Sequence, residues 1–127
     1  MSIELIKLAP KKISSSHSPQ EVQKIESKIF EKALEGIHNI ILLDEKGKTM
    51  ASKPFSKYLQ NTINRGGHSI AFVIGGAYGF SAEMKASNRQ VISLSELTFA
   101  HHLARTVLLE QIYRAFTIIN NEPYHNT

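Results

Sequence analysis

The segment Leu94-Ser95-Glu96-Leu97-Thr98-Phe99 joins a short apolar run to a long apolar stretch that we expect to be a helix from about His101. Upstream, a second apolar run, Ala71-Phe72-Val73-Ile74, ends in the turn Gly75-Gly76-Ala77-Tyr78-Gly79. Each segment thus marks the end of an expected strand, and open α/β sheets bind their ligands where the strands end. We interpret the two segments as neighbouring strand ends that face one site.

The pattern upstream and downstream predicts strands and helices in strict alternation. Alternation of this kind is typical of an α/β fold with a mostly parallel sheet and helices on both sides. The expected strands cover residues 3–8, 37–43, 70–74 and 91–94, and the expected helices start at Ser18, at Lys53 (to Asn64), near Ser81 and at His101 (to Asn120).

Several boundaries rest on local chemistry. Ser18-Pro19-Gln20-Glu21 predicts a capping box at a helix start, and Gly36 supplies a left-handed stop after that helix. Ser52 is expected to cap the second helix, and Asp44-Glu45-Lys46-Gly47 is expected to form a turn. The apolar face of the first helix is predicted to contain Val22, Ile25, Ile29, Phe30, Ala33 and Leu34.

Composition limits the class of protein. The 127 residues suffice for one domain with a core, and the absence of cysteine excludes disulfides, thiolate metal sites and cysteine nucleophiles. A formal net charge of +4 and a pI of about 9.4 mildly favour a polyanionic partner. The chain contains no signal-peptide pattern and no apolar run of the ~20 residues that a membrane span needs. We expect a single cytoplasmic domain over residues 1–127 with no membrane contact.

The final helix is apolar over far more than one stripe. A helix of this kind must be buried on most of its circumference. We therefore predict a homodimer through the C-terminal helix, with Phe116 in the seam. The alternative is a central core helix within one chain.

Common catalytic and metal-binding motifs are absent. The six histidines are scattered apart from His101-His102, and adjacent helical residues point in different directions, so we predict no metal site. No P-loop, no dinucleotide-binding glycine pattern and no serine nucleophile elbow occurs. Glycines at 75, 76 and 79 would let the backbone approach a ligand and adopt positive φ, but an ordinary strand-to-helix turn has the same composition.

Four segments taken together carry a resemblance. They are residues 42–48 (LLDEKGK), 72–79 (FVIGGAYG), 93–105 (SLSELTFAHHLAR) and 109–125, which begins LEQIYRAF and ends EPYH. In this order and spacing the series resembles the RlmH family, SPOUT-class methyltransferases of bacteria that act on N3 of a pseudouridine in large-subunit (23S) ribosomal RNA. The likeness runs from about Ile3 to the C-terminus and is most specific between Ser93 and His125.

The resemblance implies a trefoil-knotted α/β fold, a homodimer and S-adenosyl-L-methionine bound in the knot. The cofactor would be held largely by main-chain groups, with apolar side chains against the adenine faces. The matching positions are Leu43, Gly75, Leu94, Ser95, Glu96, Leu97, Thr98 and Phe99. For Leu43, Leu94 and Leu97, a place in the core is the alternative and is compatible with this role.

The resemblance also implies a ribosomal RNA or assembled-ribosome substrate. A uracil-type N3 must lose its proton before it attacks a methyl group, so a base or an anion-stabilising group is needed. The residues that we place near the substrate are His101, Arg105, Arg114, Tyr124 and His125. Their alternatives are a helix-start cap for His101, salt bridges with an acid such as Glu110 for the arginines, and a tail position for His125.

Two departures from the family pattern stand out. Ala100 occupies the position where the family usually has proline before the histidine. Members of the family also usually have an additional strand and helix before the strand matched by residues 3–8, so we expect either a shortened form or a start placed too late. Two other hypotheses remain: a catalytically reduced SPOUT-fold module that binds RNA or a nucleotide without turnover, and a SPOUT enzyme that acts on another RNA.

Overall fold

Strands and helices alternate along the chain in the predicted order. The computed structural model describes residues 2–7, 17–66, 69–76, 78–86 and 89–126. The connection expected at residues 11–16, Leu8 of the first strand, and Gly67 and Ala77 lie outside these residues. The elements are β1 (Ser2–Lys7), α1 (Pro19–Ala33), β2 (Asn39–Thr49), α2 (Ser52–Asn64), β3 (Ser69–Ile74), α3 (Ala82–Ala86), β4 (Gln90–Ser93) and α4 (His101–Ile119).

The four strands form one parallel sheet in the order β1-β3-β2-β4. The predicted parallel α/β architecture is therefore confirmed. The sequence suggested that the ends of β3 and β4 are direct neighbours. This interpretation is wrong, because β2 lies between the two strands. Parallel strands place their carboxyl ends at the same edge, so β2 contributes a third strand at that edge, between the two that the sequence pattern singled out.

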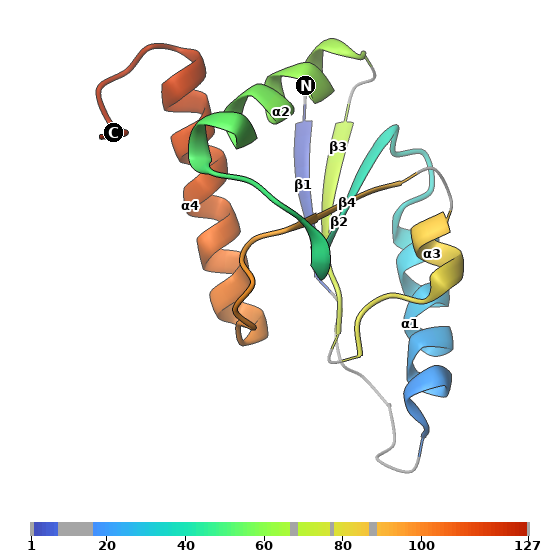
Figure 1. Ribbon diagram of the computed structural model, residues 1–127. Helices are drawn as coiled ribbons and strands as arrows, with labels where there is room; N and C mark the ends of the chain where they lie inside the picture. The colour runs from blue at the N-terminus through green and yellow to red at the C-terminus, as the bar shows by residue number, and fades with distance from the viewer. Residues whose placement is uncertain (1, 8–16, 67–68, 77, 87–88, 127) are drawn as a thin grey trace.

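Helices cover both faces of the sheet, with α2 and α4 on one side and α1 and α3 on the other (Figure 1). The side chains of β2 alternate accordingly: Ile41 and Leu43 pack in the cluster with α2 and α4, and Leu42 packs in the cluster with α1 and α3. Strands buried on both faces are expected to be apolar at every position, which explains the continuous apolar runs.

The predicted capping box is confirmed. Ser18 Oγ accepts from the Glu21 amide at 3.2 Å, and Glu21 Oε1 accepts from the Ser18 amide at 3.2 Å. Gly36 adopts the left-handed conformation at φ 80°. The expected cap at Ser52 is wrong: Ala51 is the N-cap of α2, and the Ser52 hydroxyl donates to Gln111 Oε1 at 2.8 Å, which joins α2 to α4.

The turn expected at residues 44–47 is also wrong, because β2 continues to Thr49. The four residues bulge out within the strand, so that both Leu43 and Lys48 pair with Ile92 of β4. Gly47 permits this arrangement. A Cβ added there would lie 2.7 Å from the carbonyl carbon of Ile92.

Helix α4 is apolar on two sides, as predicted. Its inner side packs in the core through Leu108, Ile112 and Ala115. Leu103 and Leu109 are each 47% exposed and Tyr113 is 56% exposed, so this outer side is largely open in the described part of the chain, although the Tyr124 ring packs edge-on against Tyr113 with 4.9 Å between the ring centres. Phe116 is half-buried against the core of its own chain, which makes it an inner residue; the exposed side chains of Leu103, Leu109 and Tyr113 are here called the outer face of α4.

We predict that Gly47→Ala lowers the free energy of unfolding by about 2 kcal/mol or more, since the new methyl group must push β4 away from β2. Urea unfolding followed by circular dichroism measures the change. Gly36→Ala is the matched control: no atom lies within 4 Å of its Cβ, so its cost is only the left-handed φ, about 1 kcal/mol. An equal or smaller effect at Gly47 would contradict the close approach.

Candidate functional site

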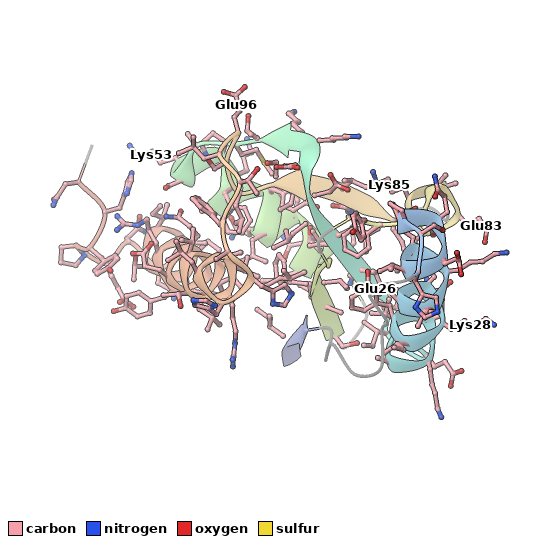
Figure 2. The ribbon with its side chains drawn as sticks, turned by 90° about the horizontal axis from the view of Figure 1, so that it is seen from below. Glu26, Lys28, Lys53, Glu83, Lys85 and Glu96 are labelled. Atoms are coloured by element: carbon pink, nitrogen blue, oxygen red, sulfur yellow. The ribbon has the colours of Figure 1, made fainter. Side chains whose placement is uncertain are left out.

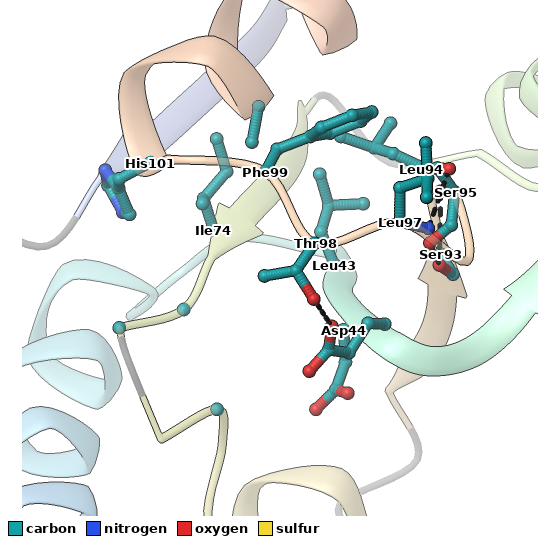
Figure 3. A pocket seen from close by; sticks show the side chains of 15 residues that line it. Leu43, Asp44, Ile74, Ser93, Leu94, Ser95, Leu97, Thr98, Phe99 and His101 are labelled. Carbon is teal, nitrogen blue, oxygen red and sulfur yellow. Dashed lines mark hydrogen bonds between the residues drawn. The ribbon is translucent and has the colours of Figure 1, made fainter.

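A cavity of about 400 Å³ opens at the carboxyl ends of β3 and β4 and at the bulge in β2. Its size lies within the range of small-molecule sites. Figure 3 shows side chains from all three strands and from the segment before α4 converging on it. The lining residues are Leu43, Asp44, Glu45, Ile74, Gly75, Gly76, Gly79, Ser93, Leu94, Ser95, Leu97, Thr98, Phe99, His101 and Ala104.

The structure brings together all but one of the residues expected to hold a cofactor. Those that line the cavity are Leu43, Gly75, Leu94, Ser95, Leu97, Thr98 and Phe99. Glu96 does not line the cavity, and its side chain extends outward from the ribbon (Figure 2). Leu43 belongs to both the core and the cavity wall, whereas Leu97 is 71% exposed at the cavity and is not a core residue.

The segment between β4 and α4, residues 94–100, is held in shape by its own hydroxyl groups. Ser93 Oγ donates to the Ser95 carbonyl at 2.7 Å, and Ser95 Oγ accepts from the Leu97 amide at 3.0 Å. The Thr98 hydroxyl donates to a carboxylate oxygen of Glu45 in the β2 bulge. The bulge and this segment therefore form one wall of the cavity. The side-chain hydrogen bonds that hold it together cannot be predicted from sequence periodicity.

Asp44 is an ionised carboxylate in the cavity wall. Burial alone would raise its pKa, but the Lys46 amide at 2.9 Å and the Lys85 ammonium at 3.0 Å together hold the pKa of Asp44 below its ordinary value. The Lys85 pair also connects the bulge in β2 to α3. The negative charge of Asp44 in the wall is therefore neutralised by the positive charge of Lys85.

The three described glycines of the turn are needed for two physical reasons, the backbone conformation and the lack of space for a side chain. The expected positive φ occurs at Gly79 (φ 72°) and at neither Gly75 nor Gly76. Space explains those two: a Cβ at Gly75 would lie 3.1 Å from the Phe80 ring, and one at Gly76 would lie 2.8 Å from the carboxyl carbon of Glu26. An ordinary strand-to-helix turn requires glycine for its positive φ, so the lack of space for a Cβ at Gly75 and Gly76 is a separate requirement.

Sequence reasoning missed Glu26. The buried face of α1 consists of Val22, Glu26 and Phe30, spaced by four residues, while Ile29, expected on that face, is 41% exposed. Glu26 is 5% exposed and its Oε1 has no hydrogen-bond partner. Burial raises the pKa of Glu26. A glutamate midway between two apolar residues at i−4 and i+4 was the available signal.

The residues expected to be catalytic fall into two groups. His101 lines the cavity at the first turn of α4, and its Nε2 is buried without a hydrogen-bond partner. Arg105 is exposed and does not line the cavity. Arg114, Tyr124 and His125 lie toward the other end of α4, and Figure 1 shows the C-terminus at the end of α4 opposite to residues 94–100. Ten residues of helix from Ala104 to Arg114 correspond to about 15 Å.

The second group forms a connected cluster. Arg114 Nη2 lies 2.8 Å from Glu110 Oε2, Arg114 Nη1 lies 3.0 Å from His125 Nδ1, and the Tyr124 hydroxyl donates to Glu110 Oε2 at 2.9 Å. The guanidinium also stacks 4.7 Å from the centre of the Tyr124 ring. The salt bridge between Arg114 and Glu110, left open as an alternative, is present, and it lowers the pKa of Glu110 and raises that of Arg114. We call Glu110, Arg114, Tyr124 and His125 the C-terminal cluster.

The described residues lack the features of two other kinds of site. No group of three or more histidine, aspartate or glutamate side chains is placed to hold a metal ion there. Among the helices described, none combines the length and apolar character required to cross a membrane.

Comparison with known proteins gives a consistent result. A family model described as "Predicted SPOUT methyltransferase" matches residues 1–125. Three similar relatives all carry the name "Ribosomal RNA large subunit methyltransferase H". They come from Christiangramia forsetii (48% identical, covering 79% of this chain and 66% of the relative), Parabacteroides distasonis (42%, covering 91% and 73%) and Geobacter sulfurreducens (52%, covering 68% and 57%). The matched region thus spans between 57% and 73% of these relatives' lengths.

We predict that Glu26→Gln stabilises the protein at neutral pH relative to the wild type. Because the folded state raises the pKa of Glu26, the stability of the wild type is greatest below the ordinary carboxyl pKa and declines as pH rises through the folded-state pKa. Glutamine does not titrate. Urea midpoints measured from acidic to neutral pH should show the advantage of the variant growing with pH; a constant difference would contradict the raised pKa.

Proposed function

The chain belongs to the SPOUT methyltransferase family, and from this premise we propose that it transfers a methyl group from S-adenosyl-L-methionine to N3 of a pseudouridine in large-subunit ribosomal RNA. The observation that supports this most strongly is the cavity where the three strands meet, since its walls are the segments that carry the resemblance. The names of the relatives agree with an RNA substrate, which would place the protein in the bacterial cytoplasm. The trefoil knot is a property of the family's fold.

The cavity fits the proposed cofactor. Gly75 and Gly76 keep the wall free of side chains, so main-chain groups there can reach an adenine edge. Leu94, Leu97 and Phe99 supply apolar surface for the ring faces. When bound, S-adenosyl-L-methionine would supply a methyl group on a positively charged sulfur, ready for attack by a nitrogen.

His101 is the residue of this chain best placed to handle a proton at the cavity. Its unpartnered Nε2 can accept the N3 proton of the substrate base, or hold the base by a hydrogen bond. In the reaction N3 loses its proton, the methyl group moves from sulfur to N3, and the sulfur becomes an uncharged thioether.

A single chain leaves the C-terminal cluster out of reach of its own cavity. The outer face of α4 offers a solution, because it exposes apolar side chains between the two sites. In a two-fold homodimer whose axis crosses this face at right angles to α4, the two α4 helices run antiparallel, and the cluster of one protomer approaches the cavity of the other. Arg114 would then stabilise the negative charge that develops on the deprotonated base.

We predict that Arg114→Ala reduces methyl transfer to unmodified large ribosomal subunits by roughly 100-fold. It should leave the affinity for S-adenosyl-L-methionine unchanged, because Arg114 does not line the cavity. Thr98→Trp should instead abolish that affinity by filling the cavity from an exposed position.

The two variants also test whether the site is shared. Co-expressed as mixed dimers, they should recover about a quarter of wild-type activity, because about half the random dimers are mixed and each holds one intact site. Transfer of tritiated methyl groups measures both effects. No recovery would exclude a site built from two protomers, and a wild-type protein that binds the donor without transferring methyl would favour the non-catalytic binding module.

We predict that Leu109→Glu produces a monomer in analytical ultracentrifugation, since it places a charge in the outer face of α4. The monomer should still bind the methyl donor but lose methyl transfer. Ile29→Glu is the matched control: Ile29 is a similarly exposed apolar side chain on α1, and its variant should remain dimeric. A dimer that persists in Leu109→Glu would place the seam elsewhere.

A further inference from the structure

The charged side chains that line the cavity are carboxylates. Among the described residues that line it, two are carboxylates, Asp44 and Glu45, and none is lysine or arginine. Asp44 is neutralised by Lys85, and Glu45 is exposed and accepts from Thr98. Neither carboxylate is therefore an uncompensated negative charge inside the protein.

A third carboxyl group lies directly behind the cavity wall. Glu26 contacts Gly76, which itself lines the cavity, so closely that a Cβ on Gly76 would overlap the carboxyl group. The Glu26 side chain projects from the buried face of α1 (Figure 2). None of the ion pairs in the described residues includes Glu26. Gly76, which has no side chain, therefore lies against both the cavity and this carboxyl group.

Such a group is costly to the fold. An unpaired carboxylate in a low-dielectric interior loses the solvation that water would provide, and its neighbours on this face of α1, Val22 and Phe30, are apolar. An apolar residue at position 26 would serve packing better. A buried titratable group without a partner beside a ligand cavity is a marker of function.

We propose that Glu26 is a specificity-determining residue that favours the positively charged methyl donor over the product, acting through the bare backbone of Gly76. The proposal rests on the function proposed above. Donor and product, S-adenosyl-L-methionine and S-adenosyl-L-homocysteine, differ by one methyl group and by the positive charge on sulfur. A carboxylate near the cavity attracts the positively charged sulfur of the donor but not the uncharged sulfur of the product. The loss of this charge in the reaction therefore weakens binding of the product and promotes its release.

Isothermal titration calorimetry with both compounds tests the proposal without any turnover. Across a separation of several ångströms in a partly buried site, one charge pair corresponds to roughly a tenfold preference for the donor. The wild type should show this preference, and Glu26→Gln should bind both compounds about equally. Glu26→Asp, which keeps the charge, should retain most of the preference. Glu35→Gln, an exposed change just after α1, is the control and should behave like the wild type.

The ratio of the two dissociation constants separates selection from a merely structural role, which would weaken both compounds together. An unchanged ratio in Glu26→Gln overturns the proposal while leaving the methyltransferase function intact. A wild-type protein that binds neither compound overturns the proposed function itself. Circular dichroism of each variant verifies folding before titration.

Discussion

The double pairing of Ile92 with Leu43 and Lys48 is the constraint on which the cavity depends. It makes residues 44–47 bulge from the pairing between β2 and β4, and in this bulge Glu45 can hold Thr98 and Asp44 can hold Lys85. Gly47 makes the pairing possible by lying against the backbone of β4. A side chain at position 47 would push Ile92 of β4 away from β2, and the wall formed by residues 94–100, which follows β4, would shift with it.

Helix α4 divides the proposed chemistry between its two ends. Its first turn belongs to the cavity through His101 and Ala104, while its last turns hold the C-terminal cluster about three helical turns away. A rigid helix cannot bring its own ends together. The apolar outer face between them thus gives a homodimer two tasks in our proposal: it covers Leu103, Leu109 and Tyr113, and it completes each site with side chains from the partner.

The order of elements, the parallel sheet and the strand-end segments could all be predicted, because they depend on periodicity and on turn residues that act locally. Ser18 capped as expected for this reason. The misplaced features depend on tertiary contacts: Ser52 bonds to Gln111 on α4 instead of capping, and residues 44–47 stay in β2 because Ile92 pairs twice. Glu26 was missed because helical periodicity groups apolar residues, and its contact with Gly76, fifty residues downstream, is a tertiary contact that periodicity does not predict.

The most direct test of the account is the map of backbone amide shifts in ¹⁵N-labelled protein on addition of S-adenosyl-L-methionine. If the cavity binds the donor through main-chain groups, the largest changes should fall in three segments, residues 43–45, 74–79 and 93–99. Residues of the C-terminal cluster should change less, since substrate is absent. Changes centred on other surfaces, or no changes in a folded protein, would contradict the assignment of this cavity to the methyl donor.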